Sequence, residues 1–281
     1  MTRKAAGPLL RALNDDGKGA AARETSRGAT GPKTLDCTIA PPSPQSPGSI
    51  RRTRSQLAFL LPTARFATTV AKLAQLPRDG LPEVAFVGRS NAGKSSAINA
   101  LCQRRRLAFA SKTPGRTQAL NCFALGPEKL DRPLALIVDT PGYGFAAAPL
   151  EVKREWDQLA GRYLQVRDAL CAVVLVMDVR RGVTELDRAL LRWIRPDVPV
   201  LVVLTKSDKL GRAQQRKALD TVEAALNEAR LPNPMSLLAF SSTTGLGLEQ
   251  ARGWVETVLG EAISARSDEH TQDEIDRNPR P

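Results

Sequence analysis

The sequence predicts a three-layer α/β domain built on a mostly parallel sheet, and three observations support this prediction. Short apolar runs alternate with amphipathic helical patterns through most of the chain. The first of these runs leads directly into a glycine-rich loop at 88–96. Hydrophobic residues make up 42% of the 281 residues, which is enough for a large core. Short apolar runs separated by helices are typical of parallel strands that are covered on both faces.

Each element of that domain is assigned from its own pattern. The expected strands are 83–87, 134–138, 170–177, 198–204 and a weaker run at 235–240. The expected helices are 94–102, 151–165, 185–194, 212–230 and 248–262. Two further segments are expected to form an antiparallel edge strand at 120–125 and a leading helix at 65–76.

The two ends of the chain differ in composition from the middle. Residues 1–63 hold ten basic and four acidic side chains and include a proline- and serine-rich stretch at 40–49. The last segment, 265–281, holds three basic and five acidic residues. Neither segment has enough apolar residues to offset the entropy of ordering the chain. We therefore predict a disordered basic extension at 1–63, a folded domain at 64–264 and a disordered tail at 265–281.

Charge and composition exclude several classes of protein. The chain has 41 Lys and Arg residues against 29 Asp and Glu, a net charge of +12, which favours polyanionic partners. A single histidine, His270, argues against a serine–histidine triad, a histidine-ligated metal and a histidine base. The four cysteines lie far apart, as expected in a reducing cytoplasm. No apolar run reaches the roughly 20 residues of a membrane helix, so we expect a cytoplasmic protein without membrane insertion.

The glycine-rich loop has the spacing of a phosphate-binding loop. It reads GRSNAGKSS and matches G-x-x-x-x-G-K-[ST] at Gly88, Gly93, Lys94 and Ser95, between a predicted strand and a predicted helix. The two glycines allow turns that point successive N–H groups at an anion in front of a helix N-terminus. Lys94 would reach the β- and γ-phosphates, and the Ser95 hydroxyl would bind Mg²⁺. The alternative is an ordinary glycine-rich turn with a chance Lys-Ser pair.

Two later motifs extend the site. The strand at 134–138 ends in DTPG, residues Asp139 to Gly142, where the aspartate can hold Mg²⁺ through water and the glycine N–H can approach a γ-phosphate. The strand at 198–204 leads into TKSD, residues Thr205 to Asp208. A carboxylate there accepts hydrogen bonds from guanine N1–H and N2–H₂, and adenine offers no such pair of donors. The backbone of Phe240 to Ser242 would contact guanine O6.

These motifs, together with two others, resemble those of a known family. GRSNAGKSS at 88–96, KTPGRTQ at 112–118, DTPGYGFA at 139–146, TKSDKL at 205–210 and FSS at 240–242 are similar to the EngB family (also YihA or YsxC) of translation-factor-type GTPases. The resemblance covers about 200 residues. It implies a Ras-like, six-stranded P-loop GTPase domain that binds GTP and GDP with Mg²⁺. It also implies a role in assembly of the large ribosomal subunit and in normal cell division and septation.

The resemblance also implies roles for individual residues. Thr117 in GRTQ would be the switch I threonine and, with Ser95, a Mg²⁺ ligand; Lys94, Thr117 and Gly142 would act in hydrolysis. Together, the motifs and the resemblance assign nucleotide contacts to Gly88, Arg89, Ser90, Asn91, Ala92, Gly93, Lys94, Ser95, Gly115, Arg116, Thr117, Gln118, Ala119, Asp139, Thr140, Pro141, Gly142, Thr205, Lys206, Ser207, Asp208, Phe240, Ser241 and Ser242.

One position departs from the usual hydrolytic machinery. Many GTPases place a water-orienting glutamine after D-x-x-G, and this chain has Tyr143. We therefore expect slow intrinsic turnover, with a partner or a bound cation supplying the missing group. Asn91 is a candidate for helping to bind K⁺, although it is equally well explained as a turn residue.

The charge predicts the partner of the protein, and several functions compete as explanations. Basic residues near the switches, Arg104 to Arg106, Lys112 and Arg116, are expected to contact ribosomal RNA phosphates, with a solvated basic face as the alternative. A monomeric GTPase switch that docks on a large-subunit precursor is the first hypothesis. An RNA-binding assembly scaffold with a structural nucleotide is the second.

The third hypothesis is a P-loop kinase or ATPase, which would lack the guanine signal at Asp208. A division role is either direct or a consequence of ribosome supply.

Overall fold

The fold is built on one twisted sheet. The computed structural model describes residues 60–109, 119–130, 132–144 and 156–277, with the backbone alone for 269–277. Within these ranges the sheet has seven strands in the order β1-β3-β4-β2-β5-β6-β7. The strands are β1 (Arg65–Val70), β2 (Glu83–Gly88), β3 (Leu120–Leu125), β4 (Ala135–Asp139), β5 (Leu170–Asp178), β6 (Val200–Thr205) and β7 (Met235–Ala239). The sheet is mostly parallel, which confirms the predicted α/β class.

The parallel strands form the centre of the molecule. Strand β2 lies between β4 and β5, and all of these pairs run parallel, as do β5 with β6 and β6 with β7. Every residue of β2 and of β6 is buried. This agrees with their nearly continuous apolar sequences, because a parallel strand covered on both faces has no solvent side. The carboxyl ends of these strands meet at one edge, where ligands bind in open α/β sheets.

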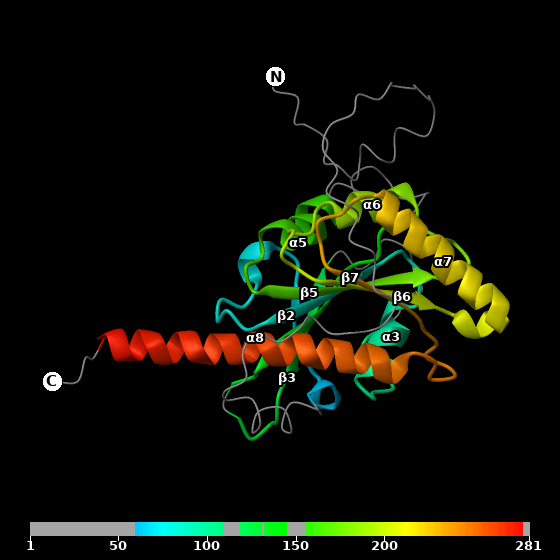
Figure 1. Ribbon diagram of the computed structural model, residues 1–281. Helices are drawn as coiled ribbons and strands as arrows, with labels where there is room; N and C mark the ends of the chain where they lie inside the picture. The colour runs from blue at the N-terminus through cyan, green and yellow to red at the C-terminus, as the bar shows by residue number, and fades with distance from the viewer. Residues whose placement is uncertain (1–59, 110–118, 131, 145–155, 278–281) are drawn as a thin grey trace, which may run out of the picture.

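Helices cover the two faces of the sheet unequally (Figure 1). One face carries α5 (Arg162–Val166), α6 (Glu185–Leu191) and α7 (Arg212–Glu228), and the other carries α3 (Lys94–Leu101) and α8 (Leu248–Arg277). Short single-turn segments are η1 (Leu61–Thr63), η2 (Leu73–Gln75), η4 (Ser207–Lys209) and a π-helical turn, η3 (Asp157–Gly161). The two separate hydrophobic clusters, one on each face, complete the predicted three layers.

The amino-terminal part of the domain corrects two predictions. Residues 65–70 form strand β1 and not the start of a helix, so the sheet has seven strands among the described residues where six were expected. The segment contains Thr68, Thr69 and Val70, whose branched Cβ atoms favour a strand. Because β1 pairs with β3, strand β3 is antiparallel as expected but lies inside the sheet.

Both ends of the folded region extend beyond the predicted boundaries. Leu60 and Leu61 are buried against the α3–α8 face, just before the predicted start at residue 64. Helix α8 continues to Arg277, through residues where the sequence predicts disorder. The extension 265–277 contains no Gly and no Pro, the residues that most disfavour a helix, so nothing in its sequence stops the helix. The remainder of the predicted disordered segments, 1–59 and 278–281, lies outside the described residues, as does 151–155 of the predicted helix at 151–165.

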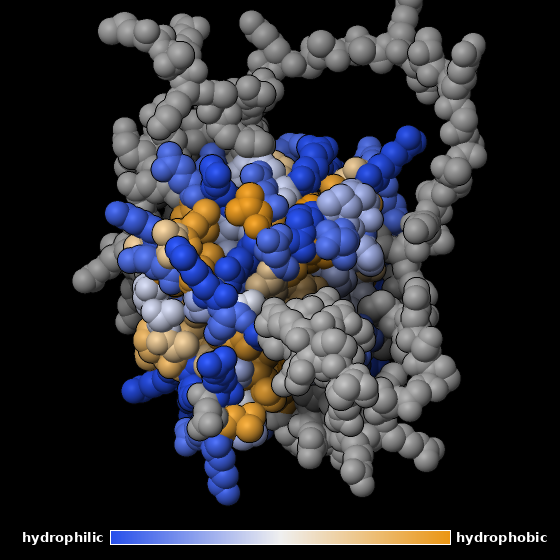
Figure 2. Space-filling model, turned by 90° about the vertical axis from the view of Figure 1, so that its left-hand side faces the viewer, coloured by the Kyte–Doolittle hydropathy of each residue, from blue (hydrophilic) through white to orange (hydrophobic). Residues whose placement is uncertain are grey.

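One side of the molecule shows mostly hydrophilic residues among those described (Figure 2). Figure 2 shows the left-hand side of the molecule in Figure 1, where hydrophilic residues surround small groups of hydrophobic ones. Among the described residues, none of the helices combines the length and the apolar character that crossing a membrane requires.

Candidate nucleotide-binding site

The predicted phosphate loop lies at the carboxyl edge of the sheet. Strand β2 ends at Gly88, and α3 begins at Lys94, so residues 89–93 form the turn between them. Asn91 and Gly93 both have left-handed backbone conformations, with φ of 64° and 99°. Such turns point successive N–H groups to the same side, and the N-terminus of α3 adds its positive dipole end. The loop therefore has the backbone geometry of an anion nest.

Two glycines are required by close packing around this loop. A Cβ on Gly88 would lie 2.5 Å from the carbonyl oxygen of Val176 on β5. A Cβ on Gly142, the glycine of DTPG, would lie 2.8 Å from Ser90 Oγ and 3.1 Å from Ser90 Cα. Real Cβ atoms do not approach that closely, so neither position accepts alanine without movement. The DTPG segment thus lies directly against the phosphate loop.

Strand β4 brings an acidic group to the same place. Asp139 is the last residue of β4, opposite Phe86 of β2, and it is 5% exposed. Its carboxylate forms an ion pair with the ammonium of Lys94. The next residue, Thr140, is fixed to the Phe86 carbonyl by its N–H (3.1 Å) and its hydroxyl (2.9 Å). The structure therefore places the lysine and the aspartate of the two motifs side by side.

The TKSD segment is tied to the phosphate loop. The hydroxyl of Thr205 donates to the carbonyl oxygens of Ala92 and, at 2.9 Å, Met177. The ammonium of Lys206 donates to the carbonyl oxygen of Asn91 at 2.7 Å. Thr205 thus occupies a buried position between β5 and the phosphate loop, and its hydroxyl contacts both. These contacts hold the base end and the phosphate end of the site in register.

The predicted guanine-binding carboxylate is oriented by the last loop. Ser241 Oγ donates to Asp208 Oδ1 at 2.7 Å and accepts the N–H groups of Thr243 and Thr244, both at 3.2 Å. The hydrogen bond from Ser241 is the main reason that the pKa of Asp208 lies below its usual value. The carbonyl of Phe240 accepts the N–H of Ser207 at 3.2 Å, which joins the two loops. Asp208 is therefore held as an ionised acceptor.

The predicted switch I segment falls mostly outside the part of the chain that the structure describes. Gly115, Arg116, Thr117 and Gln118 lie outside the described residues, and Ala119 directly precedes β3 at the edge of the site. Asn121 of β3 pairs in register with Asp139 of β4, so the start of β3 lies beside the end of β4. The individual ligand roles, including that of Thr117 on Mg²⁺, stay predictions.

Comparisons with known proteins agree with this geometry. Residues 83–206 match the family described as 50S ribosome-binding GTPase. A probable GTP-binding protein EngB from Burkholderia thailandensis is 47% identical over 212 residues, which cover 74% of this chain and 96% of the relative. A second, from Paraburkholderia phymatum, is 46% identical over 216 residues, 75% of this chain and 97% of the relative. The chain belongs to the EngB family.

A solved structure gives a further comparison. A crystal structure of a probable GTP-binding protein engB is 23% identical, covers 64% of this chain and 99% of its own, and has a TM-score of 0.49. As a member of the EngB family, the chain is a P-loop GTPase that binds GTP and GDP and hydrolyses GTP. The phosphate loop, DTPG and TKSD segments of this EngB-family chain are the ones that converge in the structure.

The donor set suits Mg²⁺ bound together with phosphates. Ser95 provides a hydroxyl at the start of α3, and Asp139 provides a carboxylate at the end of β4. Within the described ranges, no cluster of three or more His, Cys, Asp or Glu side chains could hold a metal by itself. Mg²⁺ is typically held by few protein oxygens and by the substrate phosphates, so the residues fit this ion. When bound, the ion would neutralise charge that develops on the phosphates.

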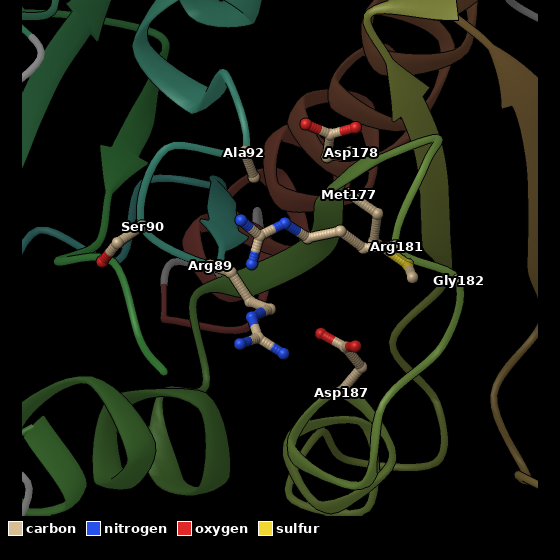
Figure 3. Close-up of a pocket in the computed structure, with 8 residues that line it drawn as sticks. All are labelled: Arg89, Ser90, Ala92, Met177, Asp178, Arg181, Gly182 and Asp187. Atoms are coloured by element: carbon tan, nitrogen blue, oxygen red, sulfur yellow. The ribbon is translucent and has the colours of Figure 1, made fainter. Parts of the chain in front are cut away.

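A pocket borders the phosphate loop on the side of β5 and α6 (Figure 3). It is lined by Arg89, Ser90, Ala92, Met177, Asp178, Arg181, Gly182 and Asp187. Figure 3 shows the guanidinium of Arg181 extending toward the phosphate loop and the side chain of Arg89 extending toward Asp187. Arg89 Nη1 donates to the Thr184 hydroxyl at 3.3 Å. The second residue of the GRSNAGKS loop is therefore directed to α6.

Two residues near the site were not predicted from the sequence. Asp178, at the end of β5, accepts hydrogen bonds from Lys206 and Arg180, and Asp187, in the first turn of α6, accepts one from Tyr143. An aspartate at the carboxyl end of an apolar run was a usable signal for Asp178. The Thr184-x-x-Asp187 spacing was a helix-capping signal for Asp187, and nothing in it indicated Tyr143 as a partner.

Proposed function

We propose that this GTPase is a monomeric, cytoplasmic assembly factor that docks on the RNA of a large ribosomal subunit precursor while it holds GTP, and leaves after hydrolysis. Normal cell division and septation would depend on it through this role. Mg²⁺, held by Ser95 and Thr117, would accompany the nucleotide. The description of the matched family as ribosome-binding supports the proposal, and so does the distribution of charge around the nucleotide site.

The observation that carries the proposal is a basic rim at the carboxyl edge of the sheet. We use this name for Arg180 and Arg181 after β5, Lys209 after β6, and Arg212 and Arg216 at the start of α7, all of which are exposed. The loops of the rim leave adjacent parallel strands, since Asp178 of β5 pairs in register with Thr205 of β6. The rim therefore lies beside the predicted nucleotide site, where the binding of RNA phosphates would depend on whether GTP or GDP is bound.

Acidic groups pair with three of the five rim residues, Asp178 with Arg180, Asp208 with Lys209 and Asp220 with Arg216, and leave two rim residues unpaired among the described residues. The side chain of Asp178 is 4% exposed and already accepts bonds from two cations, and that of Asp208 is 13% exposed. Asp220, which pairs with Arg216 at 3.3 Å, is the exposed acid close to the rim on α7. Arg181 and Arg212 have no side-chain hydrogen bond or ion pair within the described part of the chain. These guanidinium groups are available to phosphates.

The triplet Arg104–Arg106 lies elsewhere. It follows the carboxyl end of α3, an eight-residue helix whose amino end is the phosphate loop. At 1.5 Å per residue, the triplet is more than about 12 Å from the phosphates along the helix. It is exposed and basic, but it is less directly connected to the nucleotide than the basic rim is.

Co-sedimentation of the full chain with large-subunit precursor particles tests the proposal. Binding should be stronger with a non-hydrolysable GTP analogue than with GDP. No binding in either state would contradict the ribosomal role. Equal binding in both states would favour the scaffold in which the nucleotide is structural.

Two charge-matched variants test the surface. One carries Arg181→Glu, Arg212→Glu and Arg216→Glu, and the other carries Arg104→Glu, Arg105→Glu and Arg106→Glu. Both change the net charge by the same amount, so a general electrostatic effect would weaken both equally. We expect the rim variant to lose about tenfold or more in affinity at 0.1 M salt. A loss confined to the second variant would assign the RNA contact to the end of α3.

A further inference from the structure

Tyr143 occupies the position after D-x-x-G, and its side chain is buried between Trp156 and the start of α6. It is 2% exposed, and its ring packs edge-on against Trp156 with the ring centroids 5.7 Å apart. Its hydroxyl donates to Asp187 Oδ1 at 2.5 Å. Burial, and then the neighbouring Asp187 carboxylate, raise the pKa of Tyr143 well above its usual value, so the phenol remains a hydrogen-bond donor.

The acceptor of that bond is itself fixed. Asp187 is 1% exposed and lies in the first turn of α6. Its second oxygen accepts the N–H of Thr184 at 2.7 Å and the Thr184 hydroxyl at 2.6 Å, which forms the capping box of the helix. A carboxylate with three such bonds has little freedom. The Tyr143 hydroxyl is therefore anchored to the start of a rigid helix.

The backbone of Tyr143 is anchored to the phosphate loop at the same time. Its N–H donates to the carbonyl oxygen of Gly88 at 3.2 Å, and its carbonyl accepts the N–H of Ser90 at 3.0 Å. These two bonds form an isolated bridge around Arg89. One residue of the DTPGYG segment thus joins the phosphate loop to α6.

The peptide before Gly142 is fixed from the other side. The indole N–H of Trp156 donates to the carbonyl oxygen of Pro141 at 2.7 Å. Because a trans peptide is planar, this carbonyl and the N–H of Gly142 point in opposite directions, and holding one sets the direction of the other. Gly142 itself packs against Ser90, as its excluded Cβ shows. Both peptides that flank Gly142 are therefore oriented by buried protein groups.

We propose that Tyr143 is a positioning residue for GTP hydrolysis: its bond to Asp187 fixes Gly142 against the phosphate loop, with the Gly142 N–H directed at the γ-phosphate. Tyr143 stands where many GTPases have a glutamine that orients water. Its role is different, because it holds the Gly142 N–H donor in place. A donor held before the reaction stabilises charge in the transition state without reorganisation. This proposal concerns the hydrolysis step, and it stands or falls independently of the ribosomal role.

The test is Tyr143→Phe, which removes only the hydroxyl. We expect kcat for GTP to fall about tenfold, while the affinity for GDP, which has no γ-phosphate, stays within about twofold. Asp187→Asn should act in the same direction. The double variant should lose no more than the more affected single variant, because both substitutions disrupt one interaction.

The chain provides a matched control for a purely structural effect. It contains two tyrosines, and the second, Tyr163, is also buried and donates to a carboxylate, Glu83 Oε2, at 2.8 Å at the amino end of β2, the end opposite the phosphate loop. Tyr163→Phe should lower the melting temperature comparably and leave kcat of the folded protein unchanged. An unchanged kcat in Tyr143→Phe, or equal losses of kcat in the two tyrosine variants, would overturn the proposal.

Discussion

Lys206 donates a hydrogen bond to Asp178 Oδ2 at 3.0 Å, so a lysine of the base-binding motif is held by a carboxylate from the neighbouring strand. The same ammonium donates to the Asn91 carbonyl of the phosphate loop. Asp178 also accepts two bonds from Arg180, from Nε at 2.9 Å and from Nη2 at 2.6 Å. The bond from Arg180, followed by that from Lys206, lowers the pKa of Asp178 far below its usual range. The carboxylate is thus ionised whenever the protein is folded at ordinary pH.

We predict that Asp178→Asn weakens GTP and GDP binding together. The amide cannot match the charged acceptor, and Lys206 would lose its preferred orientation along the nucleotide. A hydrogen bond between charged groups contributes about 1.5–3 kcal/mol, so the affinity should fall at least about tenfold for both nucleotides. Titration with fluorescent GDP and GTP analogues measures this. Asp197→Asn, which removes an exposed partner of Arg195, is the control, and equal affinities in the two variants would contradict the prediction.

Base selectivity should depend on Asp208. Asp208→Ala removes the carboxylate that we predict to accept guanine N1–H and N2–H₂, and we expect at least about a hundredfold loss of GDP and GTP affinity with no gain for ATP. Ser241→Ala should cause a smaller loss, because it removes the group that orients Asp208. Indifference of the wild-type chain to the base would contradict the guanine assignment.

The pH dependence of this interaction has a defined sign. The pKa of Asp208 is depressed in the folded protein, so its contribution to stability is complete above its unfolded pKa of about 3.9. That contribution is lost as the pH falls through the folded pKa. Asp208 should therefore stay ionised between about pH 8 and pH 5, so the ratio of the GDP affinities of the wild type and Asp208→Ala should stay constant over that range, and a ratio that already falls at pH 6 would exclude Asp208 as the acceptor.

The sequence predicted the parallel core better than the margins of the fold. Strands β2, β5 and β6 have nearly continuous apolar sequences that a solvent-facing strand would not have, so their pattern is unambiguous. Strand β1 has no such run. Its burial alternates irregularly because one edge and part of one face meet solvent, and what makes it a strand is pairing with β3. Pairing across about 50 residues of chain leaves no local signal.

The functional site was also predicted only in part. The phosphate loop, DTPG and TKSD each bring their own backbone geometry, so short motifs were sufficient to bring Lys94, Asp139 and Asp208 to one edge. Tyr143 was interpreted only as a missing glutamine. Its partner, Asp187, is 44 residues away, and a tyrosine–aspartate pair has no characteristic spacing. Contacts that depend on the packing of α6 against the DTPGYG segment could be found only in three dimensions.

A monovalent cation offers a test of Asn91. Its backbone is left-handed and its side chain is exposed at the front of the phosphate loop, where a carboxamide oxygen could join phosphate oxygens around K⁺. If it does so, replacing Na⁺ by K⁺ should raise the GTP turnover of the wild type by about tenfold, because a cation there would stabilise transition-state charge. Asn91→Gly preserves the left-handed turn and should abolish the response. Equal rates in both salts, with or without ribosomal particles, would exclude a K⁺ role.

Asp157 makes the free energy of unfolding depend on pH in a known direction. It begins the π-helical turn η3, and neither carboxylate oxygen has a hydrogen-bond partner or meaningful solvent exposure among the described residues. Burial raises the pKa of Asp157 to about 6. Between about pH 4 and pH 6 the unfolded chain has lost this proton and the folded chain keeps it, so the free energy of unfolding falls as the pH rises.

Asp157→Asn should remove that dependence. The shift corresponds to at most about 3 kcal/mol, and because the residue is only partly buried, solvent screening reduces the expected effect to about 1 kcal/mol. The variant should melt about 2–4 °C above the wild type at pH 7.5 and at the same temperature at pH 4.5. Asp168→Asn, at a fully exposed side chain, should leave the wild-type pH profile unchanged. Parallel profiles for the wild type and Asp157→Asn would show that Asp157 ionises freely in the folded protein, with a partner that compensates for its burial.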